Sequence, residues 1–244
     1  MRLFGLIGFP LGHSFSRGYF NDKFFREGID ARYENFPLSS AGLVRSLVNE
    51  NPALAGLNVT IPYKEAVISF LDETDSEASR IGAVNTIAIS PDRRLKGYNT
   101  DVYGFRESLI PLLRTQHTHA LVLGSGGASK AVRFTLEELG IEYRVVSRRP
   151  SDSHMISYSD LPRFLGSFML IVNTSPVGMY PATDTSPDLP YDLIGPEHLA
   201  YDLVYNPETT LFMKKCGERG AKIKNGLEML HLQAGEAWKI WNRE

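Results

Sequence analysis

The chain has 244 residues, a formal net charge of -2, 43% hydrophobic residues and 22% charged residues. This near-neutral composition is typical of a soluble globular protein and gives no support to nucleic acid or a membrane surface as a partner. The single Cys216 cannot form an internal disulfide, and the apolar run at 1–8 is too short for a signal or transmembrane segment, so we expect a cytoplasmic protein.

Short apolar runs typical of strands alternate with helical stretches along most of the chain, which predicts an α/β protein. In the first half we expect strands at 3–8, 31–36, 54–59, 84–89 and 95–98, and helices at 15–27, 41–50 and 65–71. Gly28 stands where a glycine often ends a helix, and Ser14 or Ser16 could cap the first helix.

A helix expected at 102–113 leads to an apolar strand at 120–123, which ends in the glycine turn Gly124-Ser125-Gly126-Gly127-Ala128. A helix at 129–139 follows. This order of strand, turn and helix begins a dinucleotide-binding fold, in which the helix N-terminus faces a pyrophosphate. A glycine turn of this kind also occurs in α/β proteins that bind no nucleotide.

The next expected strand, 142–146, ends in Ser147-Arg148-Arg149 and lacks an acid there. An acid at this point would accept a hydrogen bond from the ribose 2′-OH of NAD, whereas guanidinium groups match the oxygens of a 2′-phosphate. The sequence therefore favours NADP over NAD. The alternative interpretation is a solvated basic loop.

Strands at 168–173 and 199–203 and helices at 211–218 and 227–241 complete the expected elements. In the last helix, apolar residues recur every three or four positions, so we interpret its tryptophans as packing residues. We place a first domain at 1–100 and a nucleotide-binding domain at 101–224, with 225–244 packing back on the first domain.

Polar clusters follow four apolar runs of the first domain, where open α/β sheets place ligand-binding groups. Simple alternatives exist for each, because Ser14 or Asp101 could cap a helix, Asn85 suits a turn and Lys64 could be a solvated lysine. The histidines lack carboxylate or thiol partners at metal-ligand spacing, so no metal site is expected. The four clusters are Gly12-His13-Ser14-Phe15-Ser16, Asn58-Val59-Thr60-Ile61-Pro62-Tyr63-Lys64, Gly82-Ala83-Val84-Asn85-Thr86 and Gly97-Tyr98-Asn99-Thr100-Asp101.

Together these clusters resemble the shikimate dehydrogenase family, in the right order and over nearly the whole chain. The segment 58–64 is similar to the catalytic-lysine motif of that family almost letter for letter, and this motif is highly specific. Arg17 stands where the family usually has proline, and Ser147 and Arg149 depart from its usual Asn-Arg-Thr. The resemblance continues in the glycine turn and in 173–179, 201–205 and 226–234.

The resemblance implies a two-domain α/β fold, with an N-terminal α/β substrate domain and a Rossmann-type doubly wound nucleotide-binding domain. It implies reversible NADPH-dependent reduction of 3-dehydroshikimate to shikimate, a step in the synthesis of chorismate and aromatic amino acids. The expected partners are the small-molecule substrate and NADP, without nucleic acid, membrane or metal. We expect a monomer or a homodimer.

The resemblance also implies a role for individual positions. Lys64 and Asp101 are the implied catalytic pair, since reducing a ketone by hydride creates an alkoxide that a positioned ammonium group can protonate. The implied substrate-binding residues are Ser14 and Ser16 for the carboxylate, with Asn58, Thr60, Asn85, Tyr205 and Gln233. The implied cofactor-binding residues are Gly124, Ser125, Gly126, Gly127, Ala128, Ser147, Arg148, Arg149, Leu203 and Gly226.

Two other functions remain open at this point. The first is an enzyme of the same family that prefers quinate or NAD, against which stand the paired Ser14 and Ser16 and the arginines without a strand-end acid. The second is a catalytically silent nucleotide-binding regulator on the same fold, and the presence of both Lys64 and Asp101 counts against it.

Overall fold

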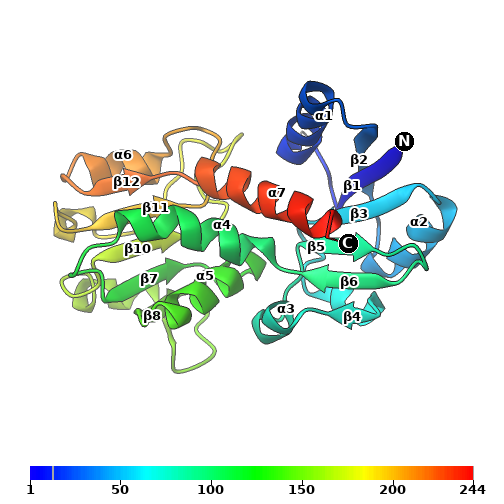
Figure 1. Cartoon of the computed structure of the whole chain (residues 1–244). Coiled ribbons are helices and arrows are strands. Elements are labelled where there is room, and N and C mark those ends of the chain that lie inside the picture. The colour runs from blue at the N-terminus through cyan, green and yellow to red at the C-terminus, as the bar shows by residue number, and fades with distance from the viewer. Residues whose placement is uncertain (13, 244) are drawn as a thin grey trace. The chain divides into compact units, whose positions relative to one another are not determined.

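A computed structural model of the chain describes residues 1–12 and 14–243. The chain divides into two compact units, Met1–Thr100 with Ala234–Glu244, and Asp101–Gln233 (Figure 1). Each unit is built around a six-stranded sheet of its own. The segment that returns to the first unit begins at Ala234, later than residue 225, where the sequence interpretation placed it.

The sheet of the first unit has the strand order β2-β1-β3-β5-β6-β4. Strand β1 pairs in parallel with β2 and β3, whereas β5 is antiparallel to β3 and to β6. The carboxyl ends of β1, β2 and β3 therefore lie at one edge of the sheet, where the start of β5 joins them. The strands are β1 (Arg2–Gly8), β2 (Ala31–Pro37), β3 (Leu54–Val59), β4 (Glu73–Thr74), β5 (Thr86–Ile89) and β6 (Leu95–Tyr98).

Helix α1 (Phe15–Glu27) packs aromatic side chains against this sheet. The Ser14 side chain caps its start, and Gly28 ends it in the left-handed conformation with φ 64°, as the sequence indicated. Phe20 and Phe24 form a buried cluster with Phe4 of β1 and Trp241. Trp241 also donates from its indole N–H to the Ile87 carbonyl at 3.0 Å, which confirms it as a packing residue.

Shorter helical elements complete the first unit. They are a 3₁₀ turn at Ala41–Leu43 continued by α2 (Val44–Glu50), a 3₁₀ helix at Ala66–Phe70 and α3 (Ser76–Ile81). The helix expected at 65–71 is this short 3₁₀ helix, and the Lys64 carbonyl before it accepts from the Val84 N–H at 2.7 Å.

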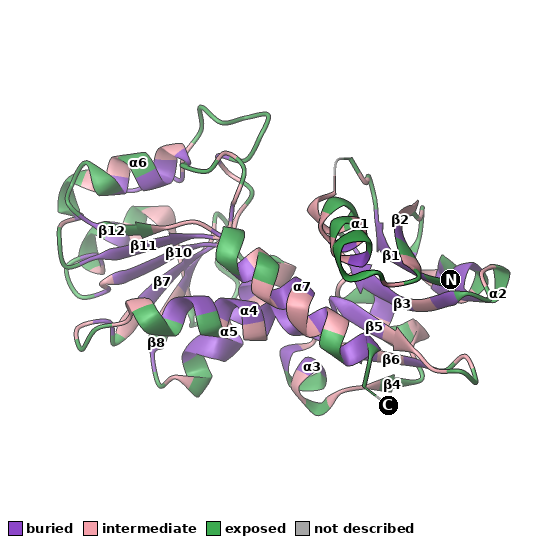
Figure 2. Cartoon of the chain, turned by 45° about the horizontal axis from the view of Figure 1, so that its top comes forward, coloured by how far each residue is buried: buried purple, intermediate pink, exposed green. Residues whose placement is uncertain are grey.

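The sheet of the second unit is entirely parallel, with the order β12-β11-β10-β7-β8-β9. From β7 the chain moves outward through β8 and β9, then returns to place β10 on the other side of β7. The central strands are buried on both faces, as Figure 2 shows. The strands are β7 (His119–Leu123), β8 (Glu142–Val146), β9 (Met155–Ile156), β10 (Leu170–Asn173), β11 (Leu199–Asp202) and β12 (Lys222–Lys224).

Helices cover both faces of this second sheet, so the doubly wound expectation is confirmed. Helix α4 (Thr100–Leu109), extended by a 3₁₀ turn at Ile110–Leu112, and α5 (Gly127–Glu138) pack on one face. Helix α6 (Leu211–Gly217) and a 3₁₀ helix at Tyr158–Arg163 pack on the other. The last helix is α7 (Leu227–Trp241). Within residues 1–12 and 14–243, no helix is long and apolar enough to cross a membrane.

Candidate functional site

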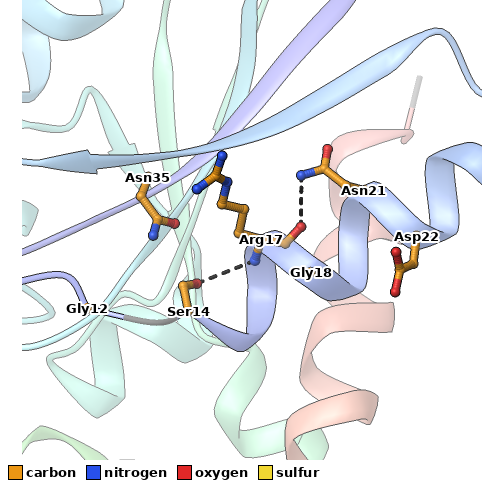
Figure 3. Close-up of a pocket in the computed structure, with 7 residues that line it drawn as sticks. All are labelled: Gly12, Ser14, Arg17, Gly18, Asn21, Asp22 and Asn35. Atoms are coloured by element: carbon orange, nitrogen blue, oxygen red, sulfur yellow. Dashed lines mark hydrogen bonds between the residues drawn. The ribbon is translucent and has the colours of Figure 1, made fainter.

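A polar pocket of about 270 Å³ lies beside the first turn of α1. Ser14 accepts from the Arg17 backbone N–H at 3.4 Å, so the expected helix cap is present and the Ser14 hydroxyl proton stays available for another acceptor. Figure 3 shows the Arg17 side chain between Asn35 and Asn21. The pocket is lined by Gly12, Ser14, Arg17, Gly18, Asn21, Asp22 and Asn35. His13, in the first polar cluster, lies outside the described residues.

This pocket has cationic and unpaired polar character. The Arg17 guanidinium is exposed and makes no ion pair with any residue in the described ranges. Asn35 Oδ1 is buried and has no hydrogen-bond partner within those ranges. A buried polar atom of this kind is normally satisfied by water or a ligand. The pocket therefore offers a ligand the Arg17 guanidinium and an acceptor that needs a donor, beside the Asp22 carboxylate.

Tyr33 connects α1 to the carboxyl edge of the sheet. The Asn21 side chain bonds both backbone groups of Tyr33 at 2.9 Å, which fixes α1 against the edge strand β2. The Tyr33 hydroxyl is buried and donates to Asn58 Oδ1 at 2.8 Å. Burial raises the pKa of Tyr33 well above its usual value, and the neighbouring Ser16 hydroxyl partly opposes that rise. Tyr33 thereby links Ser16 with Asn58.

Asn58 and Asn85 belong to one buried hydrogen-bond network. Asn58 Nδ2 donates to the Asn85 carbonyl at 3.3 Å and to Thr86 Oγ1 at 3.2 Å. Asn85 Oδ1 accepts from the Thr100 backbone N–H at 2.7 Å, and Asn85 Nδ2 donates to Thr100 Oγ1 at 3.0 Å. Both asparagines are under 10% exposed, with Asn58 at 6% and Asn85 at 3%. The network holds both amides in fixed orientations.

The other expected substrate and catalytic residues of the first unit lie close to this edge. Thr60 follows β3, and its backbone N–H donates to the Ile7 carbonyl at 2.9 Å. Lys64 is half-buried in the next turn, whose Tyr63 hydroxyl donates to the Leu38 carbonyl at 2.6 Å. These bonds hold the segment just before Lys64 in place.

Asp101, Tyr205 and Gln233 belong to the second unit. Asp101 lies buried in the first turn of α4, one residue after the helix begins. Burial raises the pKa of Tyr205. Gln233 is 8% exposed and donates to the Leu230 carbonyl at 3.0 Å.

The glycine turn of the second unit has the geometry of a phosphate cradle. Gly124 has φ 109°, a conformation that favours glycine. Gly126 precedes α5 with no side-chain cap, and a Cβ there would meet no atom within 4 Å. The N-terminus of α5 therefore begins beside open space at Gly126, between Ser125 and Ala128, as anion binding requires. The turn fits the pyrophosphate of a dinucleotide.

The basic segment after β8 lies at the carboxyl end of the same sheet. Ser147 Oγ accepts from the Arg149 backbone N–H at 3.2 Å, which shapes the turn. The Arg148 and Arg149 side chains are exposed and make no ion pair with any residue that the structure describes. Their guanidinium groups are therefore available to a phosphate.

Leu203 and Gly226 meet directly. A Cβ on Gly226 would overlap the Leu203 carbonyl, so only glycine fits there. The Gly226 N–H donates to the Val204 carbonyl at 3.2 Å, and the Leu203 N–H donates to the Asn173 carbonyl at 2.9 Å. These two expected cofactor residues therefore share one rigid loop contact.

Sequence reasoning did not name Tyr33, and it placed Thr86 and Thr100 in polar clusters without giving either a role. Tyr33, Thr86 and Thr100 complete the network around the two asparagines. The signal for Tyr33 was its place in a strand with alternating polarity. Among the residues in the described ranges, no group of three or more His, Cys, Asp or Glu is arranged to hold a metal ion.

The fold and these residues define a class: a two-unit α/β protein whose second unit is a Rossmann-type nucleotide-binding domain. A family profile described as the shikimate dehydrogenase substrate binding domain matches residues 6–87. An NADP(+) shikimate dehydrogenase from Geobacillus kaustophilus is 38% identical, over 98% of this chain and 92% of the relative. The chain belongs to the shikimate dehydrogenase family.

Solved structures agree with this assignment. A shikimate 5-dehydrogenase from Thermus thermophilus, in complex with NADP(H) and shikimate, has a TM-score of 0.86 and 34% identity, covering 99% of this chain and 94% of that one. A Listeria monocytogenes shikimate 5-dehydrogenase, in complex with shikimate and NAD, has a TM-score of 0.87 and 27% identity, covering 100% and 92%.

Proposed function

We propose that the chain catalyses the reversible NADPH-dependent reduction of 3-dehydroshikimate to shikimate, in the biosynthesis of chorismate and the aromatic amino acids. The observation that carries this proposal is the 38% identity to an NADP(+) shikimate dehydrogenase over 98% of the chain. The similarity is not confined to one domain, since it includes both the lysine segment and the glycine turn.

We assign cofactor binding to the second unit, Asp101–Gln233. The N–H groups at the start of α5 would hold the pyrophosphate between Gly124 and Ala128, where the open space beside Gly126 leaves room for it. Arg148 and Arg149, with Ser147, would bind the 2′-phosphate, while Leu203 and Gly226 would border the same site. When bound, NADP supplies the hydride.

We assign substrate binding mainly to the first unit, 1–100 with the end of α7. The Ser14 hydroxyl, whose proton is not spent within the described residues, would donate to the substrate carboxylate, with Ser16 beside it. Asn58, Thr60 and Asn85 would contact the polar groups of the ring. Tyr205 and Gln233 would complete the substrate contacts.

Lys64 is the proposed proton donor in ketone reduction, and its neutral amine the acceptor in the reverse direction. Asp101 is the second proposed catalytic residue. Its negative charge would favour the ammonium form of Lys64, which reduction requires, while desolvation would favour the neutral form needed for oxidation. We further propose that the enzyme acts in the cytoplasm as a monomer or homodimer, to be checked by light scattering after gel filtration.

A panel of shikimate and quinate against NADP and NAD, followed at 340 nm, tests the proposed function. We expect turnover of shikimate with NADP at a kcat/KM well above the other three combinations. Preference for quinate or NAD would identify the same-family alternative. No turnover with any pair, by a protein that still binds a nucleotide, would identify a silent regulator.

A further inference from the structure

The segment 173–178 forms one wall beside the glycine turn. It follows β10, which lies next to β7 where the strand order reverses, and ligands of open parallel sheets bind at the carboxyl ends beside such a reversal. The Thr174 hydroxyl donates to the Leu123 carbonyl at 2.9 Å and to the Gly124 carbonyl at 3.3 Å. The loop after β10 therefore touches the backbone that would cradle the pyrophosphate.

Asn173 sets the conformation of this loop. Its Oδ1 atom accepts from the Ser175 backbone N–H at 3.1 Å and from Ser175 Oγ at 2.7 Å. Because a backbone N–H can only donate, these bonds fix which side of the Asn173 amide is oxygen. The Nδ2 side then faces Asp202, donating to its Oδ1 atom at 2.9 Å.

Asp202 ties that amide to two further segments. Its Oδ1 atom also accepts from the Val204 N–H at 3.0 Å, and its Oδ2 atom accepts from Thr210 Oγ1 at 2.6 Å. Thr210 in turn caps α6 by accepting from the Met213 N–H at 3.3 Å. One carboxylate thus joins the loop after β10, the loop after β11 and the start of α6.

Burying the Asp202 carboxylate costs free energy that a residue serving only to pack the core would not require. Asp202 has no exposed surface, and desolvation raises its pKa to about 6 despite three donors. The titratable groups that face it, Cys216 of α6 and Tyr191, are themselves held neutral by pKa values raised through burial. An apolar side chain would avoid this cost of desolvation, but would leave Asn173 and Val204 without their acceptor.

We propose that Asp202 is a positioning residue of the dinucleotide site: through Asn173 and Thr174 it holds the loop 173–178 against the glycine turn, and so keeps the pyrophosphate cradle in its binding conformation. This inference rests on the proposed function, which names the cofactor. The pyrophosphate is common to NADP and NAD, so loss of the Asp202 acceptor weakens the binding of both nucleotides by the same factor. This distinguishes Asp202 from Arg148, whose proposed partner is the 2′-phosphate alone.

Dissociation constants for NADP and NAD, measured at pH 8 by isothermal titration calorimetry without substrate, test the inference. We expect Asp202→Ala to raise both constants by at least about tenfold, as for a lost hydrogen bond to a charged group. Asp202→Asn should bind both nucleotides within about threefold of wild type, because its carbonyl can face Asn173 and Val204 while its amide donates to Thr210 Oγ1.

Tyr201→Phe is the matched control. Tyr201 is the preceding residue of β11, equally buried, and its hydroxyl bonds Ser108 Oγ at 2.7 Å on the opposite face of the sheet. The substitution removes one buried hydrogen bond of the same strand without touching either loop. It should lower the melting temperature but leave both dissociation constants unchanged.

Asp202→Ala binding both nucleotides within about threefold of wild type would overturn the inference, as would an equal loss in Tyr201→Phe. If Asp202→Ala does not fold, Thr174→Val removes the hydroxyl bonds to the Leu123 and Gly124 carbonyls and leaves the backbone bond to Leu123 in place, and both constants should rise at least about threefold. Unchanged constants there would equally overturn it. Wild-type protein that binds neither nucleotide would refute the proposed function itself, a result distinct from all of these.

Discussion

The two buried asparagines of the first unit differ in what they can still offer a ligand. Asn58 donates both amide hydrogens, to the Asn85 carbonyl and to Thr86 Oγ1, and its oxygen accepts one bond from Tyr33. Asn85 donates one amide hydrogen to Thr100 Oγ1, while its oxygen already accepts from the Thr100 N–H and from the Thr86 hydroxyl. Toward the residues that the structure describes, Asn85 is therefore left with one donor hydrogen and Asn58 with one acceptor lone pair.

Replacing Lys64 tests the proposed proton transfer. We expect Lys64→Ala to lower kcat by about 10² to 10⁴, the range for losing a general acid–base group. The KM for shikimate should change much less, because the lysine acts mainly on charge that develops in the transition state. Lys222→Ala, at an exposed lysine of β12, is the control and should retain wild-type kcat. A Lys64→Ala enzyme with near wild-type kcat would show that Lys64 is not the proton donor.

Replacing Arg148 tests the basis of cofactor preference. We expect Arg148→Ala to raise the KM for NADP at least about tenfold, equivalent to about 1.4 kcal/mol, while the KM for NAD scarcely changes. Added salt should weaken NADP binding more than NAD binding, because the contact is exposed and ionic. Arg163→Ala, also exposed, provides the control. Equal use of both cofactors by wild type would show that the arginine pair lies in a solvated loop and does not determine cofactor preference.

At the scale of elements, the sequence predicted best those helices and strands with clear signals at their ends. The bounds of α1 were predicted correctly because Ser14 and Gly28 mark its two ends, and β8 was likewise predicted correctly between Gly140 and the basic turn. Strands of two or three residues, such as β4, β9 and β12, are too short to show a periodicity. Helix α3 was also missed, although its Asp75 cap and Gly82 terminator were visible signals.

The prediction of site residues from the sequence was limited in a similar way. The polar clusters could be found because each follows an apolar run, but their hydrogen-bond partners lie far away in the sequence. Tyr33 is 25 residues from Asn58, and Asp202 is 29 residues from Asn173. Pairings of this kind depend on strand order and register, which a single sequence does not contain.

Tyr33 provides the test of how α1 and β2 support the substrate residues. Tyr33→Phe removes the donor to Asn58 Oδ1 and the partner of Ser16 without changing the aromatic stacking on Phe20, whose ring centroid is 4.8 Å away. We expect the KM for shikimate to rise about three- to tenfold, since a buried neutral hydrogen bond contributes about 1 kcal/mol. The KM for NADP should be unchanged. If Tyr201→Phe raises the shikimate KM equally, Tyr33 has no specific role.

At the scale of the whole molecule, both units gather their polar residues at the carboxyl ends of parallel strands. In the first sheet the antiparallel β5 adds to this edge, because Asn58 pairs with Thr86 and so brings Asn85 beside the end of β3. In the second sheet, the ends of β7, β10 and β11 carry Gly124, Asn173 and Asp202. The stability of the second unit therefore includes the cost of a carboxylate buried at the carboxyl edge of its sheet.

That cost predicts a dependence of stability on pH. Asp202 has a pKa of about 6 in the folded protein, above the ~3.9 of an unfolded aspartate, so the folded state holds this proton more tightly. Its contribution to the free energy of unfolding is fully present below about pH 4 and is lost as the pH rises through 6, a decrease of about 3 kcal/mol. The pKa of His117 is lowered by burial and acts in the opposite direction.

Comparing wild type with Asp202→Asn isolates the carboxylate, because His117 contributes to both proteins. We expect the free energy of unfolding, measured by urea titration between pH 4 and 7.5, to fall in wild type relative to Asp202→Asn as the pH rises to about 6 and then to run parallel with it. Cys216 and Tyr191, which face Asp202, do not titrate between pH 4 and 7.5, because burial raises the pKa of Cys216 to about 12 and also raises that of Tyr191. Curves that stay parallel throughout would show that Asp202 is ionised with an ordinary pKa, and that its burial is offset by its three donors.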